Sequence, residues 1–378
     1  CALPILLLLK GNFGRPGAGI SPIRGHSNVQ GDRTVGIDEK PSEAYLDRVR
    51  DVFGFDPPRA HGHHTVESVA AMERGTAKVF IGLGGNFVRA VPDTDRSYAA
   101  MRKLALTVGI TTKLNRGHLV HGREALILPV VARSEAIRTA LGEQFITVED
   151  SFSNVSASRG VLEPASPDLM PEVEIVCRMA MATLPASKVP WADYIDDYGR
   201  IRDRIADVYP AIYSDFSERI QAPNGFHLDV PPRRRVWQTA NGKANFLVLP
   251  GLEVNAPVAD PEMLRLATVR SHDQFNTTIY SYNDRYRGVY NDRMVLFMNA
   301  EDRTCRGLEA GSRVALETIS DDGIDRRVEG LTLLDYPMAR GSVAGYYPEL
   351  NPLLPLDYHD KTSGTPAAKS IPVRVVAG

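Results

Sequence analysis

Cysteine is scarce in this chain, which has only three in 378 residues. Cys1, Cys177 and Cys305 lie too far apart in sequence to form a CxxC metal or redox motif. A disulfide framework is therefore not expected, which favours a reducing, cytoplasmic compartment. No cluster of cysteine, histidine and carboxylate has the spacing of a metal site, so we expect no metal ligands within the chain.

Excess charge of one sign and long hydrophobic runs are also absent. The formal net charge is −2, so no basic field favours binding to nucleic acid or to a membrane surface. The apolar run Ala2–Leu9 is too short to span a bilayer and has no basic flank, so neither a transmembrane segment nor a signal peptide is expected. We interpret this run as the end of a buried helix and the chain as a fragment.

Helices alternate with short apolar strands in the first half of the chain. The run KVFIGLG at Lys78–Gly84 ends in glycines, as a buried parallel strand would, and two further strands are expected at Ala105–Ile110 and Ala125–Val130. Helices are expected before and between them, at Thr65–Arg74 and Thr94–Leu104. This alternation predicts a βαβ arrangement, in which ligands bind at the carboxyl ends of the strands.

Glycines and polar residues follow two of these strands. Gly84, Gly85 and Asn86 come after the first, and TTKLNRGH at Thr111–His118 comes after the second. No GxGxxG or Walker A sequence is present, so these residues are a weak nucleotide signal by themselves. A plain turn from strand to helix would have the same composition.

Two polar segments have both a functional and a structural interpretation. The sequence HGHH at His61–His64 resembles a metal cluster, but no second group of ligands pairs with it, so we interpret it as the exposed lead-in to a helix. Phe145–Arg159 is rich in serine and is expected to be a loop that lines a cleft.

The middle of the chain is expected to be helical and then irregular. Helices are predicted at Pro171–Ala182 and Trp191–Tyr209, with the carboxylates of Asp196 and Asp197 on a solvated face. An irregular connection at Gly225–Phe246 follows. It contains three consecutive arginines that could bind phosphate or form a surface cluster.

The last third of the chain has the strand spacing of a barrel. Short β runs are expected at Leu264–Val269, Met294–Met298, Arg313–Ile319, Arg327–Leu333, Ser342–Gly345 and Ile371–Val376. That spacing predicts a closed or six-stranded barrel. The loop after the first run is crowded with hydrogen-bonding side chains, which could position a large polar ligand or simply face solvent.

Several segments, taken in order, resemble one family. They are GNFGRPGAGISPIRGHSNVQG, IGLGGN, ALILPVVARSE, TANGKANF, LATVRSHDQFNT, MNAEDRTCRGLEAGSRV and YYPELNPLLP…TPAAKSIPVRV. The sequence resembles the C-terminal half of molybdopterin oxidoreductases of the formate dehydrogenase/dimethyl sulfoxide reductase superfamily. Within it, the nearest group is the YdeP-like, formate-dehydrogenase-type alpha subunits. The resemblance covers essentially the whole chain, and the ordered set is more specific than any one motif.

The resemblance implies an α/β fold, with a partial dinucleotide-binding βαβ domain followed by a C-terminal six-stranded, double-psi-like β-barrel domain. Residues 1–40 would form a cleft segment joined to a missing N-terminal half, and residues 41–185 the second half of the α/β cofactor-binding domain. Residues 186–260 would form a helical and irregular connector, and residues 261–378 the molybdopterin-dinucleotide-binding barrel.

The resemblance also implies a molybdenum ion held by two molybdopterin guanine dinucleotides, with a 4Fe-4S cluster expected from the missing N-terminal region. Arg24 falls on the arginine that formate dehydrogenases place beside the metal, where a guanidinium can hold a carboxylate, so it is the expected catalytic residue. The residues that fall on cofactor-binding positions or line the implied cleft are Arg24, His26, Asn28, Gly84, Gly85, Asn86, Thr112, Arg116, Asn154, Arg270, Gln274, Asn276, Asn351 and Lys369.

The implied reaction is oxidation of formate to CO2, with electrons leaving through the cluster to an electron-transfer partner protein. The chain by itself lacks the cysteine or selenocysteine metal ligand and is not expected to be active. It departs from the family at Gly85, where a glutamate is usual, near Thr112, where an aspartate binds guanosine, and at His26, where glutamine is usual. These departures leave two alternatives open: an oxidoreductase acting on another small oxyanion or oxo-substrate, and a non-catalytic cofactor-binding or assembly relative.

Overall fold

The computed structural model describes residues 2–22, 28–246, 262–361 and 363–378. Contacts divide the chain into two compact units. The first unit is Cys1–Gly62 with Pro129–Asn255, and the second unit is His63–Leu128 with Ala256–Gly378. The domain boundaries expected at residues 40, 185 and 260 stay predictions. Among the described residues, no helix combines the length and the apolar character needed to cross a bilayer.

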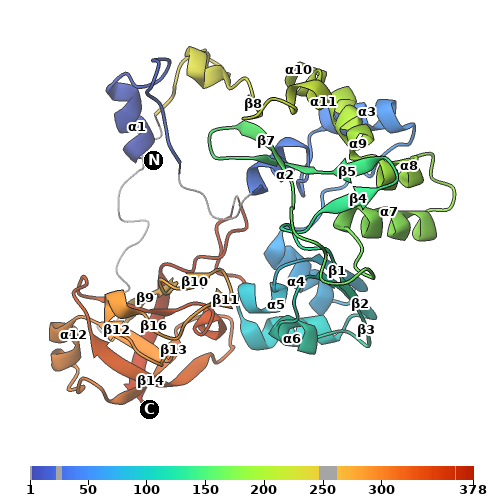
Figure 1. The fold of residues 1–378 in the computed structure, drawn as a ribbon. Coiled ribbons are helices and arrows are strands. Elements are labelled where there is room, and N and C mark those ends of the chain that lie inside the picture. The colour runs from blue at the N-terminus through green and yellow to red at the C-terminus, as the bar shows by residue number, and fades with distance from the viewer. Residues whose placement is uncertain (1, 23–27, 247–261, 362) are drawn as a thin grey trace. The chain divides into compact units, whose positions relative to one another are not determined.

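A three-stranded sheet lies in the N-terminal part of the second unit (Figure 1). Its strands run in the order β1 (Val79–Leu83), β2 (Leu106–Thr111) and β3 (Glu124–Pro129). The strands β1 and β2 pair in parallel, and α5 (Phe87–Ala90) and α6 (Thr94–Arg102) connect them. This is the βαβ connection that the alternating sequence indicated. Its role in binding a dinucleotide stays a prediction.

Helices cover one face of this sheet. The helix α4 (Thr65–Glu73) packs on α6, and Val69, Met101 and Leu104 are almost fully buried between them and the sheet. On β1, by contrast, Val79, Ile81 and Leu83 are all about half exposed. Alternate residues of a strand point to opposite faces, so these three side chains define one exposed apolar face.

The sequence HGHH leads directly into α4. The Nδ1 atom of His64 accepts a hydrogen bond from the backbone N–H of Glu67 at 3.4 Å, and the Glu67 carboxylate accepts one from the backbone N–H of His64 at 3.1 Å. This reciprocal capping box satisfies two helix-terminal donors. Within the described part of the chain, no three His, Cys, Asp or Glu side chains are grouped as metal ligands.

A closed barrel forms the C-terminal part of the second unit, as the strand spacing predicted. Its strands are β9 (Leu264–Val269), β12 (Val295–Met298), β13 (Arg313–Thr318), β14 (Arg327–Asp335), β15 (Ser342–Tyr346) and β16 (Ile371–Ala377). They close in the order β12-β14-β13-β16-β9-β15, and the pairs β9/β15 and β12/β14 are parallel. All four residues of β12 are buried, and Leu264 and Leu266 of β9 point into the core. Closure leaves no unpaired edge strand.

Short elements complete the second unit. They are the 3-10 helices η1 (Arg116–Leu119), η4 (Arg285–Arg287) and η5 (Asn351–Leu353), the helix α12 (Ala300–Cys305), and the hairpin strands β10 (Gln274–Phe275) and β11 (Thr278–Ile279).

Buried polar groups join the sheet segment to the barrel inside the second unit. Arg326, just before β14, donates to both carboxylate oxygens of Asp93, at 3.1 and 2.6 Å. Asn351 is 2% exposed, and its Nδ2 donates to the carbonyl of Arg89 at 2.8 Å. A bidentate charged pair and an amide that reaches a helix end therefore set how α5 and α6 pack on the barrel.

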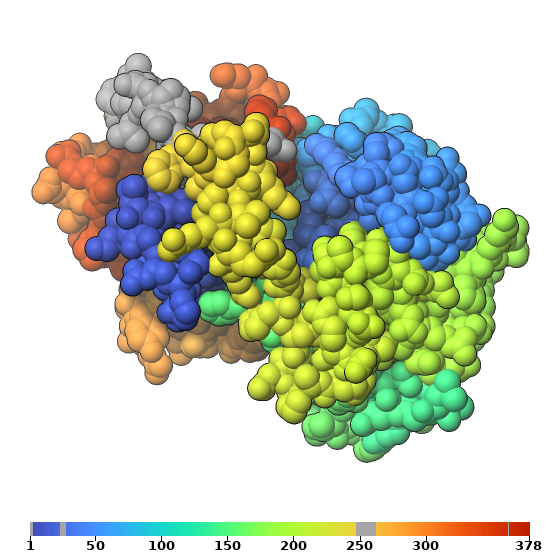
Figure 2. All heavy atoms as spheres, turned by 90° about the horizontal axis from the view of Figure 1, so that it is seen from above, coloured from blue at the N-terminus to red at the C-terminus, as the bar shows by residue number. Residues whose placement is uncertain are grey.

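The first unit is mostly helical, and Figure 2 shows its later helices as a yellow-green mass. Its helices are α1 (Ala2–Leu9), α2 (Val29–Thr34), α3 (Glu43–Phe53), α7 (Glu172–Thr183), α8 (Trp191–Asp196), α9 (Tyr198–Val208), α10 (Pro210–Tyr213), α11 (Phe216–Arg219) and the 3-10 helix η2 (Pro231–Arg234). Its strands are β4 (Ile137–Thr139), β5 (Gly142–Gln144), β6 (Ile146–Glu149), β7 (Asn154–Ser158) and β8 (Phe226–His227). Cys177 of α7 is buried, as expected for a small apolar side chain.

Three expectations for the first unit were wrong. The polar segment Phe145–Arg159 is not a loop: β6 and β7 pair antiparallel, because Phe145 and Val155 are buried and hydrophobic alternation outweighs the serine content. The helix expected at Trp191–Tyr209 breaks at Asp197, whose carboxylate accepts from the N–H of Gly199 at 2.7 Å and caps α9. In α1, Leu3, Leu6 and Leu9 are exposed rather than buried, since no described segment covers that side of the helix.

Candidate functional site

The loop that follows β9 is built around Arg270. Its Nη2 donates to the Oδ1 atom of Asn276 at 2.5 Å, and its guanidinium lies 5.9 Å from the ring centre of Tyr347. Asn276 has a φ of +53°, a left-handed conformation that asparagine tolerates better than most residues. The loop thus folds back so that an exposed cation stands beside an aromatic face.

Gln274 ties the same loop to the segment after β15. Its Nε2 donates to the carbonyl of Asn276 at 2.7 Å and to the carbonyl of Tyr347 at 2.6 Å. Lys369 lies on the other side of β9 and donates from Nζ to the carbonyl of Thr268. Burial lowers the pKa of Lys369, and the nearby charge of Arg270 lowers it further. Two cations are therefore gathered where β9 ends.

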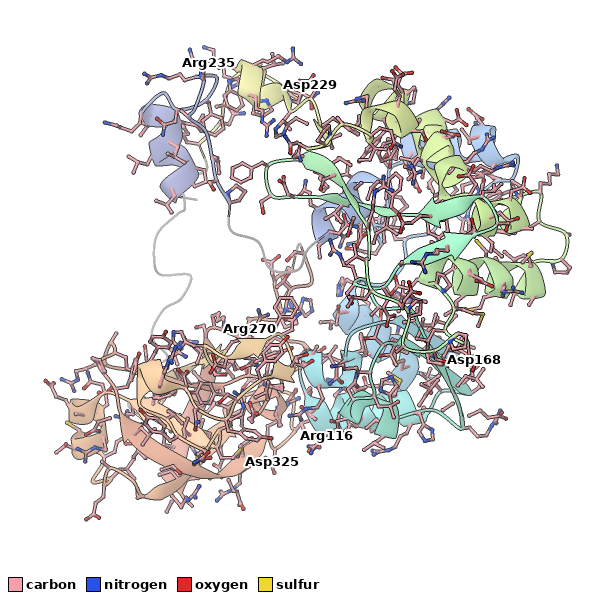
Figure 3. All side chains as sticks on the ribbon, in the orientation of Figure 1. Arg116, Asp168, Asp229, Arg235, Arg270 and Asp325 are labelled. Atoms are coloured by element: carbon pink, nitrogen blue, oxygen red, sulfur yellow. The ribbon has the colours of Figure 1, made fainter. Side chains whose placement is uncertain are left out.

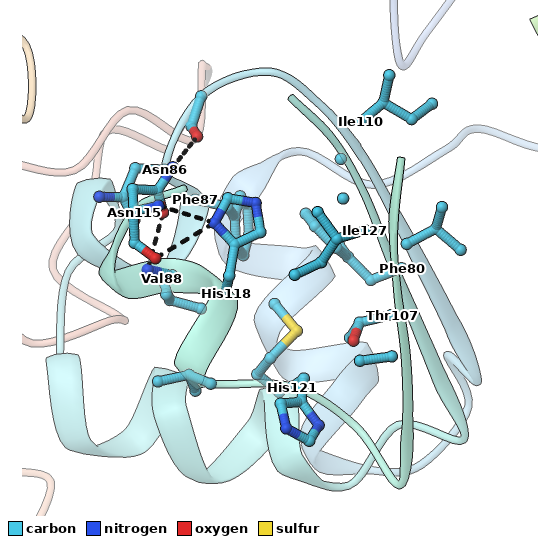
Figure 4. A pocket seen from close by; sticks show the side chains of 18 of the residues that line it. Phe80, Asn86, Phe87, Val88, Thr107, Ile110, Asn115, His118, His121 and Ile127 are labelled. Atoms are coloured by element: carbon cyan, nitrogen blue, oxygen red, sulfur yellow. Dashed lines mark hydrogen bonds between the residues drawn. The ribbon is translucent and has the colours of Figure 1, made fainter. Parts of the chain in front are cut away.

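A second group of residues lies at the carboxyl end of β1. Gly84 and Gly85 have φ values of +68° and +72°, and a Cβ added to either would meet no atom within 4 Å. Their backbone therefore borders open space, which a ligand could approach closely. The Nδ2 of Asn115 donates to the carbonyl of Gly85 at 3.0 Å and holds this turn against the residues after β2 (Figure 4).

Asn86 carries an unsatisfied polar atom at the same place. Its Oδ1 is buried and has no hydrogen-bond partner in the structure. Figure 4 shows Asn86, Asn115 and His118 at the rim of a cavity of about 70 Å³, whose interior is lined by apolar side chains such as Phe80 and Ile110. Ligand pockets usually measure ~300–1,000 Å³, so this cavity holds a few waters or the edge of a ring, not a whole cofactor.

The two groups approach each other around α5. Burial raises the pKa of Tyr347, and the positive charges of Arg270 and of Arg89 in α5 oppose that rise. The positive charges of both arginines therefore act on the Tyr347 hydroxyl. The segment after β15 contacts α5, because Asn351 donates to the carbonyl of Arg89, and it contacts the Arg270 loop, because the carbonyl of Tyr347 accepts from Gln274. The glycine turn leads directly into α5, and we call this series of segments the strip.

The other expected site residues have different positions. Arg24 and His26 lie outside the described residues. Thr112 and Arg116 are exposed after β2, and Figure 3 shows Arg116 and Arg270 on different parts of the second unit. Asn28 and Asn154 belong to the first unit.

In that first unit, both asparagines hold backbone groups. The Oδ1 of Asn28 accepts from the N–H of Glu149 at 3.0 Å, and the Nδ2 of Asn154 donates to the carbonyl of Asn224 at 3.0 Å. These contacts connect segments that are distant in sequence. Their expected role in cofactor binding stays a prediction.

Three residues that contribute to this strip were not among the predicted site residues: Arg89, Asn115 and Tyr347. Asn115 could have been found, because Asn115 and His118 have the spacing of a capping box after a strand. Tyr347 and Arg89 had no such signal, since they are brought near the site by strands and helices that are distant in sequence.

Comparison with known proteins gives this geometry a family context. Residues 264–372, which run from the start of β9 into the start of β16, match the family described as "Molydopterin dinucleotide binding domain". The matched residues lie in the second unit.

Longer relatives extend the match to nearly the whole chain. Protein YdeP of Escherichia coli O6:H1 is 49% identical over 372 residues, which are 98% of this chain and 49% of that protein. An uncharacterized oxidoreductase of Mycobacterium tuberculosis is 48% identical over 376 residues, which are 98% of this chain and 48% of that protein. These matches support membership of a molybdopterin oxidoreductase family. The chain spans about half the length of these relatives.

A solved structure shares the fold. The acetylene hydratase from Pelobacter acetylenicus superposes with a TM-score of 0.53 at 15% sequence identity, covering 89% of this chain and 50% of that one. At this identity the likeness concerns the fold alone.

The described residues fit part of a molybdopterin dinucleotide. An anionic pyrophosphate needs cations, which Arg270 and Lys369 supply, and a close approach to the backbone, which the open glycine turn allows. The N–H of Gly84 itself donates to the carbonyl of Ile110 at 2.7 Å. The orphaned Oδ1 of Asn86 can accept a hydrogen bond from a ring nitrogen. The cavity of about 70 Å³ is too small to hold the whole group.

Proposed function

We propose that this chain forms the part of a molybdopterin-dependent oxidoreductase that closes over the dinucleotide of its cofactor. The observation that carries this proposal is that the segment after β15 contacts both the Arg270 loop and α5, which follows the glycine turn, in the unit that the family model matches. When bound, the cofactor supplies two-electron redox chemistry at its metal.

In this proposal, the chain's own residues bind the anionic part of the cofactor and orient it. Arg270 neutralises an anionic group and uses the face of Tyr347 to keep its guanidinium in place. Lys369 adds a second positive charge where β9 ends. Gly84 and Gly85 let a ligand reach the backbone, where a side chain would keep it away.

The substrate we propose is formate, with another small oxyanion or an oxo-substrate as the alternative. In this proposal Arg24 holds the substrate carboxylate, and electrons pass through a 4Fe-4S cluster outside this chain to an electron-transfer partner. Support for formate comes from the place of Arg24 in PIRGHSNVQG. The departures at His26, Gly85 and Thr112 support the alternative.

The cofactor role is tested by occupancy in the full-length protein that carries this chain. Arg270→Ala should lower bound molybdenum and pterin together by about tenfold, because a charge-assisted contact is lost. The matched control is Arg313→Ala, which removes an exposed arginine of the same barrel that donates to the carbonyl of Gly330. Full occupancy in Arg270→Ala, or an equal loss in the control, would contradict the proposal.

The catalytic role is tested separately. Arg24→Lys keeps the charge but loses the planar fork, so turnover per bound molybdenum should fall roughly a hundredfold while molybdenum content stays near normal. If Arg24→Lys empties the site and Arg270→Ala leaves it full but slow, the two roles are reversed.

A further inference from the structure

Arg293 is a buried cation whose three guanidinium nitrogens all donate hydrogen bonds. It is 5% exposed and lies two residues before β12. Its Nε and Nη2 donate to the two carboxylate oxygens of Glu349 at 2.7 and 2.9 Å. Its Nη1 donates to the Oγ of Ser271 at 3.0 Å, and Nη2 also reaches the Oε1 of Gln274 at 3.0 Å and the carbonyl of Tyr347 at 2.9 Å.

These contacts hold two chain segments that carry the proposed ligand contacts. One is the loop after β9, held through Ser271 and Gln274, and the other is the segment after β15, held through Tyr347 and Glu349. Gln274 in turn holds Asn276, because its Nε2 donates to the Asn276 carbonyl. Asn276 accepts a hydrogen bond from Arg270, so Arg293 is linked to Arg270 through these two residues. One buried guanidinium therefore sets the distance between Arg270 and the ring of Tyr347.

We propose that Arg293 is a positioning residue that orders Arg270 for an anionic ligand. This inference rests on the proposed function. Arg270 has a long, exposed side chain, so fixing it in one rotamer on ligand binding costs conformational entropy and reduces the free energy of binding. By fixing the loop before the ligand arrives, Arg293 lowers that cost.

Only arginine suits this position. Its planar fork matches the Glu349 carboxylate through two parallel hydrogen bonds. Nη1 still donates to Ser271, and the remaining N–H of Nη2 is shared between Gln274 and Tyr347. A lysine would keep the charge beside Glu349 but could not span both segments.

The first test is a double-mutant cycle on the full chain, with guanosine diphosphate as the probe and calorimetry as the readout. We expect Arg270→Ala and Arg293→Lys each to weaken binding about tenfold, and the double variant to be no weaker than Arg270→Ala alone. This non-additivity shows that Arg293 acts through Arg270. A multiplicative loss, of roughly a hundredfold in the double variant, would overturn the proposal. Arg313→Lys is the control for a barrel arginine outside this network.

The second test is local proteolysis, and it does not depend on the ligand. In native Arg293→Lys, trypsin should cut after Arg270 about tenfold faster than in the unchanged chain, while cleavage after Arg327 on β14 stays the same, because only the loop is released. An equal rise at both sites, or no rise at Arg270, would overturn the positioning role. If Arg293→Lys does not fold, Glu349→Gln weakens the same fork and should give the same pattern.

The two tests separate the two claims. If the unchanged chain does not bind guanosine diphosphate, the proposed dinucleotide function loses its support, and the cleavage pattern still decides on Arg293. If binding is normal and the cycle is multiplicative, the function stands and the positioning role fails.

Discussion

Two carboxylates, one in each unit, are buried to the same depth in opposite surroundings. Asp284 of the second unit is 1% exposed, and His272 Nδ1 and Arg287 Nη1 contact it at 2.7 and 2.6 Å. The hydroxyl of Tyr346 donates a further hydrogen bond to it at 2.9 Å. Glu149 of the first unit is 3% exposed, and neither of its carboxylate oxygens has a hydrogen-bond partner in the structure.

The difference shows that burial alone does not decide how a charge affects stability. A buried charge with several donors is compensated, whereas one without donors bears its full desolvation cost. The barrel side of the second unit repeats the compensated arrangement at Asp93, Arg293 and Arg326. We infer that these networks stabilise the region that holds the proposed site, and that Glu149 destabilises the first unit.

The largest expected effect comes from taking a partner away from a compensated charge. Arg326→Met leaves Asp93 buried without its bidentate partner, and we expect the free energy of unfolding to fall by about 3–5 kcal/mol. Urea titration measures this loss. Arg327→Met is the matched control at the next position, since its ion pairs are exposed, and it should cost at most about 1 kcal/mol. Equal losses of stability in the two variants would contradict the inference that the buried ion pair contributes more to stability than the exposed ones.

Asp284→Asn should have the next largest effect. It removes the negative charge from three hydrogen bonds, so we expect a loss of about 2 kcal/mol at neutral pH. Burial by itself would raise the pKa of Asp284, but the bonds from His272, Arg287 and Tyr346 outweigh it and hold the pKa below its ordinary value of 3.8.

The sign of the pH dependence follows from this lowered pKa. The stabilisation by Asp284 is present above pH 3.8 and is lost as the pH falls through the lower, folded-state pKa. The gap between the original chain and Asp284→Asn should therefore be constant near neutral pH and shrink in acid. Asp273→Asn, at an exposed position of the same loop, is the control. A gap that widens in acid would contradict the assigned sign.

Glu149→Gln tests the uncompensated side, with a smaller effect of opposite direction. The substitution keeps the shape and removes a buried charge without donors, so stability should rise by about 1 kcal/mol at neutral pH. The exposed Glu143→Gln on β5 should change nothing measurable. A loss of stability in Glu149→Gln would show that this carboxylate is compensated after all.

The smallest expected effect concerns the exposed apolar face of β1. Ile81 is 51% exposed, and Ile81→Thr should change stability by less than about 0.5 kcal/mol. Ile110→Thr on the neighbouring strand is the control: Ile110 is 1% exposed, and its loss should cost about 2 kcal/mol. Thermal unfolding of both variants makes the measurement. A large loss of stability in Ile81→Thr would mean that this face of β1 is buried against another surface under the conditions of the measurement.

The sequence by itself determined the closed six-stranded barrel and the βαβ connection. Periodic hydrophobic runs and turn residues are local signals, so β9 and β12 were found nearly residue for residue. It also determined the polar character of the loop after β9. Local signals gave the wrong prediction at Phe145–Arg159, where the high serine content indicated a loop but two antiparallel strands form.

Only the tertiary structure decided which polar residues meet. Arg293, Glu349 and Ser271 are far apart in the chain and come together because β9, β12 and β15 close into one barrel. Whether a buried charge has donors depends on such long-range contacts, because no local pattern records what lies across a core. For the same reason Asp284 and Glu149 look alike in sequence and differ in the folded protein.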